Sequence, residues 1–205
     1  VLGDHGEELD EHELWYDHHG LYETNLWVPL IFHHPTAVPD MQRLSGMVTL
    51  TDVAPTILDL CGLSDVADEG GMDGISLRPL MDNGSHAGAR DGIYLTENAW
   101  MRKRGWRTPR YKLIVETGHT PEVYGLSSDE LYDLVTDPEE QDNLIDARPE
   151  VAADLRRDMD AHVEKRLAET GLPDPTVEQD ITLRKIGDLA TAVPKDQVFG
   201  DDDDA

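Results

Sequence analysis

Two apolar patterns in the first part of the chain predict a strand followed by a helix. Residues 28–32 form an apolar run bounded by polar residues, which is typical of a buried strand. In residues 51–61 the apolar positions recur three to four apart, as on one face of a helix. Asp52 can cap this helix and Gly62 can end it. With the apolar start of the chain, this alternation predicts that residues 1–90 belong to an α/β domain.

The pattern then changes to short strands and one long helix. Three short segments are typical of strands, the last two with polar–apolar alternation: residues 93–95, 111–115 and 130–134. Apolar residues next recur at every fourth position in residues 151–167, with Pro149 suited to the first helical position and Gly171 to the end. We therefore expect residues 91–171 to form a small subdomain, an antiparallel sheet with a packed helix. Residues 172–205 are expected to form an acidic tail.

Charge narrows the classes of protein that the chain can belong to. It has 43 acidic and 17 basic residues among 205, a net charge of −26, and Arg is more frequent than Lys. Such a charge repels itself in the folded state unless salt screens it, so we expect a salt-adapted, haloarchaeal protein, with an acidic mesophilic one as the alternative. Nucleic-acid binding is not expected, because phosphates require basic side chains.

Three further features bound the interpretation. The longest apolar run near a polar cluster, residues 26–32, is far shorter than the roughly 20 residues of a membrane helix. The single cysteine, Cys61, excludes a disulfide within the chain, and its place in the predicted helix favours a buried thiol. The chain begins at Val1, within an apolar segment and just before a dense polar cluster, so we expect preceding residues that are not part of it.

The polar cluster at the start of the chain has the composition of a cation site. Four of the nine histidines lie in residues 5–19, among many carboxylates. Asp4 and His5 follow an apolar segment directly, and Gly6 allows a sharp turn. An imidazole and a carboxylate both offer lone pairs at neutral pH, so the pair is a candidate divalent metal site, with an ordinary acidic loop as the alternative. His12 is a weaker candidate, for which a hydrogen-bonded structural role is expected.

A series of motifs then carries a family resemblance. In chain order they are residues 3–7 (G-D-H-G-E), 12–15 (H-E-L-W), 22–23 (Y-E), 28–31 (V-P-L-I), 51–60 (T-D-V-A-P-T-I-L-D-L), 73–80 (D-G-I-S-L-R-P-L), 110–114 (R-Y-K-L-I) and 130–144. Each motif alone is weak, but the series resembles the sulfatase family over about the first 170 residues.

The resemblance implies the C-terminal part of an alkaline-phosphatase-like α/β/α sandwich, followed by a small antiparallel sheet with a helix. It implies hydrolysis of sulfate esters of a small molecule or carbohydrate, with a divalent metal, usually Ca²⁺ and alternatively Mn²⁺, bound by Asp4 and His5. The nucleophile of the family is a formylglycine made from a C/S-x-P-x-R motif. That motif is absent here and is expected in an N-terminal half, so this chain alone is expected to be inactive.

One position departs from the family pattern. Where many sulfatases have a Lys that contacts the sulfate, this chain has Asp17, followed by His18 and His19. We expect His18 to make the catalytic contact with the anion and Asp17 to orient it; alternatively, both histidines only line the loop. The departure keeps open a phosphonate or phosphate ester hydrolase of the same superfamily. A separate alternative is a non-catalytic acidic module that binds cations.

Overall fold

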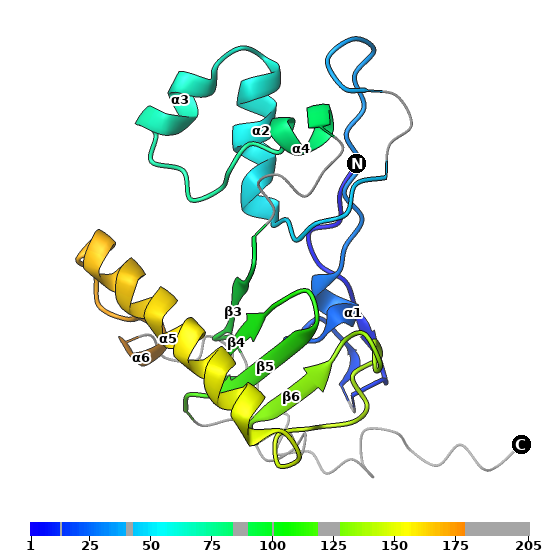
Figure 1. The fold of residues 1–205 in the computed structure, drawn as a ribbon, viewed down its shortest axis with the longest axis vertical. Coiled ribbons are helices and arrows are strands. Elements are labelled where there is room, and N and C mark those ends of the chain that lie inside the picture. The colour runs from blue at the N-terminus through cyan, green and yellow to red at the C-terminus, as the bar shows by residue number, and fades with distance from the viewer. Residues whose placement is uncertain (13, 40–42, 84–89, 100, 119–127, 179–205) are drawn as a thin grey trace, which may run out of the picture. The chain divides into compact units, whose positions relative to one another are not determined.

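The computed structural model describes residues 1–12, 14–39, 43–83, 90–99, 101–118 and 128–178 (Figure 1). Its contacts divide the chain into two compact units. The first unit comprises Val1–Gly6 and Trp27–Ile93, and the second comprises Glu7–Leu26 and Tyr94–Ala205. Glu7–Leu26 therefore groups with the C-terminal part of the chain, whereas the sequence assigned all of residues 1–90 to one domain. The domain assignment of the sequence analysis stays a prediction, and residues 179–205 of the expected tail lie outside the described residues.

The first unit contains the predicted helix and two shorter ones. A 3₁₀ turn, η1 (Leu50–Asp52), leads into α2 (Val53–Leu60). Cys61 caps the end of this helix, and Gly62, with a φ of +74°, follows and stops it. The helices α3 (Ser64–Glu69) and α4 (Arg78–Asn83) follow. The prediction of a helix ended by Gly62 is thus confirmed.

Asp52 does not cap α2 through its side chain, contrary to the expectation. Its carboxylate accepts hydrogen bonds from the backbone N–H of Thr49 at 2.8 Å and of Ile75 at 2.9 Å, and both oxygens contact the Arg90 guanidinium. The Ile75 loop approaches η1 so closely that a Cβ on Gly74 would lie 1.9 Å from the Thr51 carbonyl oxygen. Asp52 therefore ties this loop to the start of the helix.

Two burial predictions for the first unit are wrong. In residues 28–32 only Leu30 pairs, in an antiparallel bridge with Leu2, and 58% of Ile31 is exposed. The described residues provide one neighbour for this segment, so it is not enclosed as a central strand would be. Cys61 is exposed, because α2 buries Pro55 and Thr56 on its opposite side.

The second unit is built on a four-stranded sheet. Its strands are ordered β3 (Ile93–Glu97), β4 (Lys103–Arg107), β5 (Tyr111–Glu116) and β6 (Glu130–Asp133), and the last three pair antiparallel. Three of these strands were predicted, and β4 was not. The backbone of β4 lies close to its neighbours, since a Cβ on Gly105 would lie 2.9 Å from the Leu113 carbonyl oxygen.

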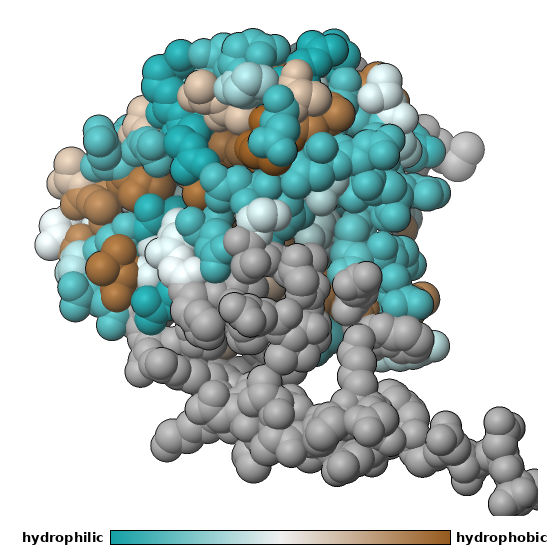
Figure 2. Space-filling view, turned by 90° about the horizontal axis from the view of Figure 1, so that it is seen from below, coloured by the Kyte–Doolittle hydropathy of each residue, from teal (hydrophilic) through white to brown (hydrophobic). Residues whose placement is uncertain are grey.

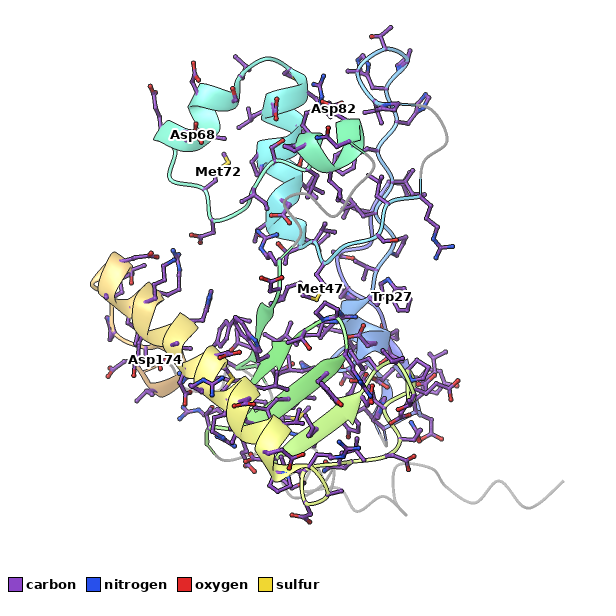
Figure 3. All side chains as sticks on the ribbon, viewed as in Figure 1. Trp27, Met47, Asp68, Met72, Asp82 and Asp174 are labelled. Carbon is purple, nitrogen blue, oxygen red and sulfur yellow. The ribbon has the colours of Figure 1, made fainter. Side chains whose placement is uncertain are left out.

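The long helix packs on one face of this sheet, as predicted. α5 (Pro149–Thr170) crosses the strands (Figure 1) and ends at Gly171, which has a φ of +65°. The apolar cluster between helix and sheet contains Leu113, Val115 and Leu131 from the strands and Ala152, Leu155 and Met159 from α5. A short helix, α6 (Pro175–Glu178), follows; Asp174 just before it (Figure 3) is paired with Arg104 of β4.

Residues 7–12 and 14–26 cover the opposite face of the sheet. They contain the paired strands β1 (Glu8–Leu9) and β2 (Trp15–Asp17) and the helical turn α1 (Glu23–Leu26). A second apolar cluster joins this segment to the sheet; its buried members are Leu14, Leu21, Tyr22, Met101, Ile114 and Tyr132. No helix in the described part of the chain has the length and apolar character needed to cross a lipid bilayer.

Candidate functional site

The turn that carries Asp4 and His5 begins where the pairing with Leu30 ends. The Gly3 N–H donates to the Pro29 carbonyl oxygen at 3.1 Å, and the next two side chains are exposed. His5 Nδ1 lies 2.8 Å from the Gly6 carbonyl oxygen. A carbonyl only accepts hydrogen bonds, so Nδ1 carries the proton and Nε2 of the neutral ring keeps its lone pair.

This turn fits a divalent cation. Asp4 Oδ2 lies 3.9 Å from His5 Nε2. Ligand distances in such sites are about 2.0–2.6 Å, so one ion can contact two donor atoms with this separation. A metal-binding histidine commonly donates its other ring N–H to a backbone carbonyl, as His5 does to Gly6. The pair could supply two ligands to such an ion, and the exposure of both side chains leaves room for others.

His18 lies in the second unit directly after β2, in the turn of residues 18–22 that joins this strand to α1. Its backbone N–H donates to Asp17 Oδ1 at 2.8 Å, and its ring Nδ1 lies 3.6 Å from the same oxygen. About half of the His18 side chain, 52%, is exposed. Asp17 thus lies where it can orient His18, and the ring is accessible from solvent.

The neighbouring His19 is buried and held on both sides of its ring. Nδ1 lies 3.2 Å from Glu97 Oε1, and Nε2 lies 3.4 Å from Asp17 Oδ1. Burial lowers the pKa of His19, but the hydrogen bond and charge of Glu97, with the charge of Asp17, outweigh it and raise that pKa above its ordinary value. The sequence analysis did not find Glu97, which lies 78 positions away and in no recognisable motif.

His12 has a structural role in the same segment. Its Nδ1 lies 3.0 Å from the buried Glu8 carboxylate, its Nε2 lies 3.2 Å from the Glu139 carbonyl oxygen, and its ring stacks on Tyr22 with centroids 3.8 Å apart. The Thr24 hydroxyl also donates to Glu8. His12 therefore connects the β1–β2 hairpin to the rest of the second unit through these hydrogen bonds and the ring stacking.

Buried charges attach the end of this segment to the sheet. Lys112 of β5 is fully buried, and its Nζ lies 3.0 Å from Glu23 Oε1, 2.6 Å from Glu140 Oε1 and 2.8 Å from the Leu21 carbonyl oxygen. Arg107 of β4 contacts Glu23 at 2.9 Å. Burial raises the pKa of Glu23, but Arg107 and Lys112 outweigh it and hold that pKa below its ordinary value. The sheet therefore fixes the C-terminal end of the segment that presents His18.

The structure brings Asp4 and His5 together in the first unit, and it joins His18 to Asp17 and His19 in the second. None of the three predicted site residues is buried, so each is open to a ligand.

Comparisons with known proteins converge on one family. Residues 10–169 match the family described as "N-sulphoglucosamine sulphohydrolase, C-terminal". The chain is 30% identical to arylsulfatase K of Rattus norvegicus over 164 residues, which cover 74% of this chain and 27% of that protein. It is 31% identical to choline-sulfatase of Rhizobium meliloti (strain 1021) over 142 residues, covering 69% of this chain and 25% of that protein.

The fold is similar to that of a protein solved in complex with its substrate D-glucosamine-2-N,6-O-disulfate. The TM-score is 0.68 at 26% identity, with 87% of this chain and 35% of that chain covered. The chain spans about a quarter of the length of the curated relatives described above.

Proposed function

Because the chain belongs to the sulfatase family and matches its C-terminal part, we propose that it is a segment of a metal-dependent sulfuric ester hydrolase. Its α/β fold is the C-terminal part of an alkaline-phosphatase-like sandwich with a small antiparallel sheet and a packed helix. The chain contains no C/S-x-P-x-R motif. We therefore assign the formylglycine nucleophile to another segment of the whole protein and expect this chain alone to be inactive.

The observation that carries the proposal is the opening turn. Asp4 Oδ2 and His5 Nε2 would hold the metal, with Ca²⁺ as the first candidate and Mn²⁺ as the second. When bound, the metal supplies Lewis-acid stabilisation of the negative oxygens of a sulfate ester. The Gly6 carbonyl keeps the His5 ring in the tautomer and orientation that this role requires.

His18 would contact the sulfate. Its half-exposed ring can donate a hydrogen bond to an anionic oxygen, and this contact is strongest when the ring is protonated. Asp17 would otherwise repel the sulfate, but its charge is directed at His18 and His19, both within 3.6 Å of Oδ1. An imidazole can thus replace the lysine found in many relatives.

The substrate class follows from what the relatives share. The names of those relatives refer to aryl sulfates, to choline sulfate and to a disulfated glucosamine, which have only the sulfated group in common. We propose a sulfated small molecule or carbohydrate as the substrate.

A paired assay of the complete enzyme tests the proposal. We expect kcat/KM for an aryl sulfate to exceed that for the matching aryl phosphonate monoester at least tenfold, and His18→Ala to lower the sulfate value. His33→Ala, which removes an exposed histidine of the first unit, is the control and should have no effect. A preference for the phosphonate would establish the rival hydrolase. Absence of turnover on both substrates, with metal supplied, would establish a non-catalytic module.

A further inference from the structure

Four ionisable side chains of the second unit form a continuous series from its interior to its surface. Glu97 Oε1 lies 3.2 Å from His19 Nδ1, His19 Nε2 lies 3.4 Å from Asp17 Oδ1, and that oxygen lies 3.6 Å from His18 Nδ1. Carboxylates and imidazoles alternate along the series. The exposed fraction of the side chains is 10% at Glu97, 8% at His19, 29% at Asp17 and 52% at His18. The series therefore begins at a part-buried strand residue and ends at the ring proposed to contact sulfate.

The Glu97 carboxylate also binds the backbone around this series. The N–H groups of Gly20 and Ala99 donate to Glu97 at 3.2 and 3.3 Å. The Asn25 side-chain amide donates to the His19 carbonyl oxygen at 2.7 Å. Glu97 thus contacts the His19 ring, the backbone after it and the loop that follows β3. A carboxylate with this many partners does more than neutralise one charge, because it also fixes the position of the turn.

Packing also restricts the turn. Gly20 has a φ of +96°, and a Cβ at this position would lie 3.0 Å from side-chain atoms of both Leu14 and Tyr22. The turn therefore packs directly against the buried apolar cluster that covers the sheet. A shift of His19 would have to disturb that packing, which makes the turn a rigid base for its exposed neighbour.

We propose that Glu97 of β3 is a positioning residue for His18, acting through His19 and Asp17. This inference rests on the proposed function, since the value of positioning lies in the contact of His18 with sulfate. The charge of Glu97 keeps the His19 ring oriented between two carboxylates. His19 then holds Asp17 Oδ1, and that oxygen holds both the backbone N–H and the ring of His18.

A cation bound at the turn is the competing explanation. Donor atoms of Asp17, His18 and His19 all lie within 4.8 Å of one another. However, carboxylates already occupy both ring nitrogens of His19: Nδ1 faces Glu97 Oε1 at 3.2 Å and Nε2 faces Asp17 Oδ1 at 3.4 Å. The geometry therefore favours an imidazole ring held between two carboxylates.

Glu97→Gln in the complete enzyme tests the inference, because it keeps the size of the side chain and removes the charge. We expect kcat/KM on an aryl sulfate to fall about 10- to 100-fold, as for other residues that orient a functional side chain. In ¹³C-histidine NMR spectra of the same enzyme, the His19 pKa should fall and the His18 ring signals should shift. Glu97→Asp, which retains the charge, should retain more activity than Glu97→Gln.

Two further variants separate positioning from loss of structure. Asp174→Asn removes a comparably part-buried carboxylate, the partner of Arg104, from the same unit and should leave kcat/KM and the His18 signals unchanged. Asp17→Asn removes the next link in the series at a more exposed place. It should reproduce the loss of kcat/KM even if Glu97→Gln fails to fold.

Three results would overturn the inference. They are unchanged His18 signals and kcat/KM in Glu97→Gln, an equal loss in Asp174→Asn, and displacement of the His18 and His19 signals by one equivalent of added Zn²⁺. Failure of the proposed function is distinguishable from these results. In that case the unmodified enzyme does not hydrolyse sulfate esters, whereas the NMR coupling between Glu97 and His18 is still measurable.

Discussion

At the residue scale, the stability of the first unit depends on the buried carboxylate of Asp52. Asp52 is fully buried, and its oxygens accept hydrogen bonds from Arg90 at 2.6 and 2.7 Å as well as from two backbone N–H groups. Burial raises the pKa of Asp52, but the hydrogen bonds from Arg90, Ile75 and Thr49 outweigh it and hold that pKa below its ordinary value. A buried carboxylate that loses its positively charged partner keeps the free-energy cost of desolvation but no longer has the electrostatic attraction that compensates for it.

We therefore expect Arg90→Ala to lower the free energy of unfolding by about 3 kcal/mol. The control is Arg78→Ala, which breaks a more exposed pair with Asp82 of α4, in which the side chains are 34% and 46% exposed, and should cost about 0.5 kcal/mol or less. Urea denaturation of both variants measures the difference. Equal losses in the two variants would show that the burial of Asp52 does not matter.

His12 makes the stability of the second unit dependent on pH. Burial lowers the pKa of His12, but the hydrogen bond and charge of Glu8 and the charge of Glu140 outweigh it and raise that pKa. A raised pKa in the folded state means that the stabilising interaction is complete below the ordinary value of about 6.5 and is lost as the pH rises through the folded-state pKa.

The free energy of unfolding should therefore decrease as the pH rises above about 6.5. His12→Gln should show a smaller decrease, and His33→Gln, at an exposed position, should match the unmodified chain. Denaturation at several pH values measures these slopes. The same slope in His12→Gln as in the unmodified chain would contradict the assignment.

The candidate site residues were proposed from local motifs, whereas the partners that the fold supplies were missed. Asp4 and His5 stand in a short motif and His18 follows another, so they could be proposed without a structure. Glu97 and Arg90 each complete a contact over a long stretch of chain, 78 positions to His19 and 38 to Asp52. A single sequence contains no information on which distant charges meet.

At the element scale, hydrophobic periodicity predicted the helix that has one apolar face and missed the strand that buries a charged side chain. α5 was predicted from its four-residue spacing, which the packing against β5 and β6 confirms. β4 was missed because its charged sequence, K-R-G-W-R, has the polarity of an exposed loop. In the fold Lys103 is buried by its contact with Glu130, which also accepts hydrogen bonds from Tyr22 and Tyr132. In a sequence, a buried charged residue cannot be distinguished from an exposed one until its partner is known.

The attachment of α5 can be tested at Met159, which is 2% exposed and belongs to the cluster between helix and sheet. Met159→Ala should cost about 3 kcal/mol of unfolding free energy, because it removes apolar contact and leaves a cavity. The control Val135→Ala, at a residue 67% exposed, should change it by about 0.5 kcal/mol or less. Similar effects of the two substitutions on thermal unfolding would show that α5 is not part of the core.

At the scale of the whole molecule, the net charge of −26 is the dominant property. Hydrophilic residues cover much of the described surface visible in Figure 2. The Debye length falls from about 10 Å in 0.1 M salt to about 3 Å in 1 M salt, so repulsion between surface carboxylates decreases. We expect the Tm to rise by about 5 °C or more over this range.

A variant with less charge provides the control for this effect. Replacement of Asp65, Asp68 and Glu69 of α3, all exposed, by their amides should reduce the rise in Tm. A Tm that does not change with salt, in the chain and in the variant alike, would exclude salt adaptation.

The central claim is that Asp4 and His5 bind the metal of a sulfatase. The most direct measurement is the metal content and sulfate-ester turnover of the complete enzyme with Asp4→Ala, beside the control Asp68→Ala in α3 (Figure 3). We predict that Asp4→Ala lowers both the bound divalent metal and the turnover at least about 100-fold, while the control retains both. Full metal content and full turnover in Asp4→Ala would contradict the claim.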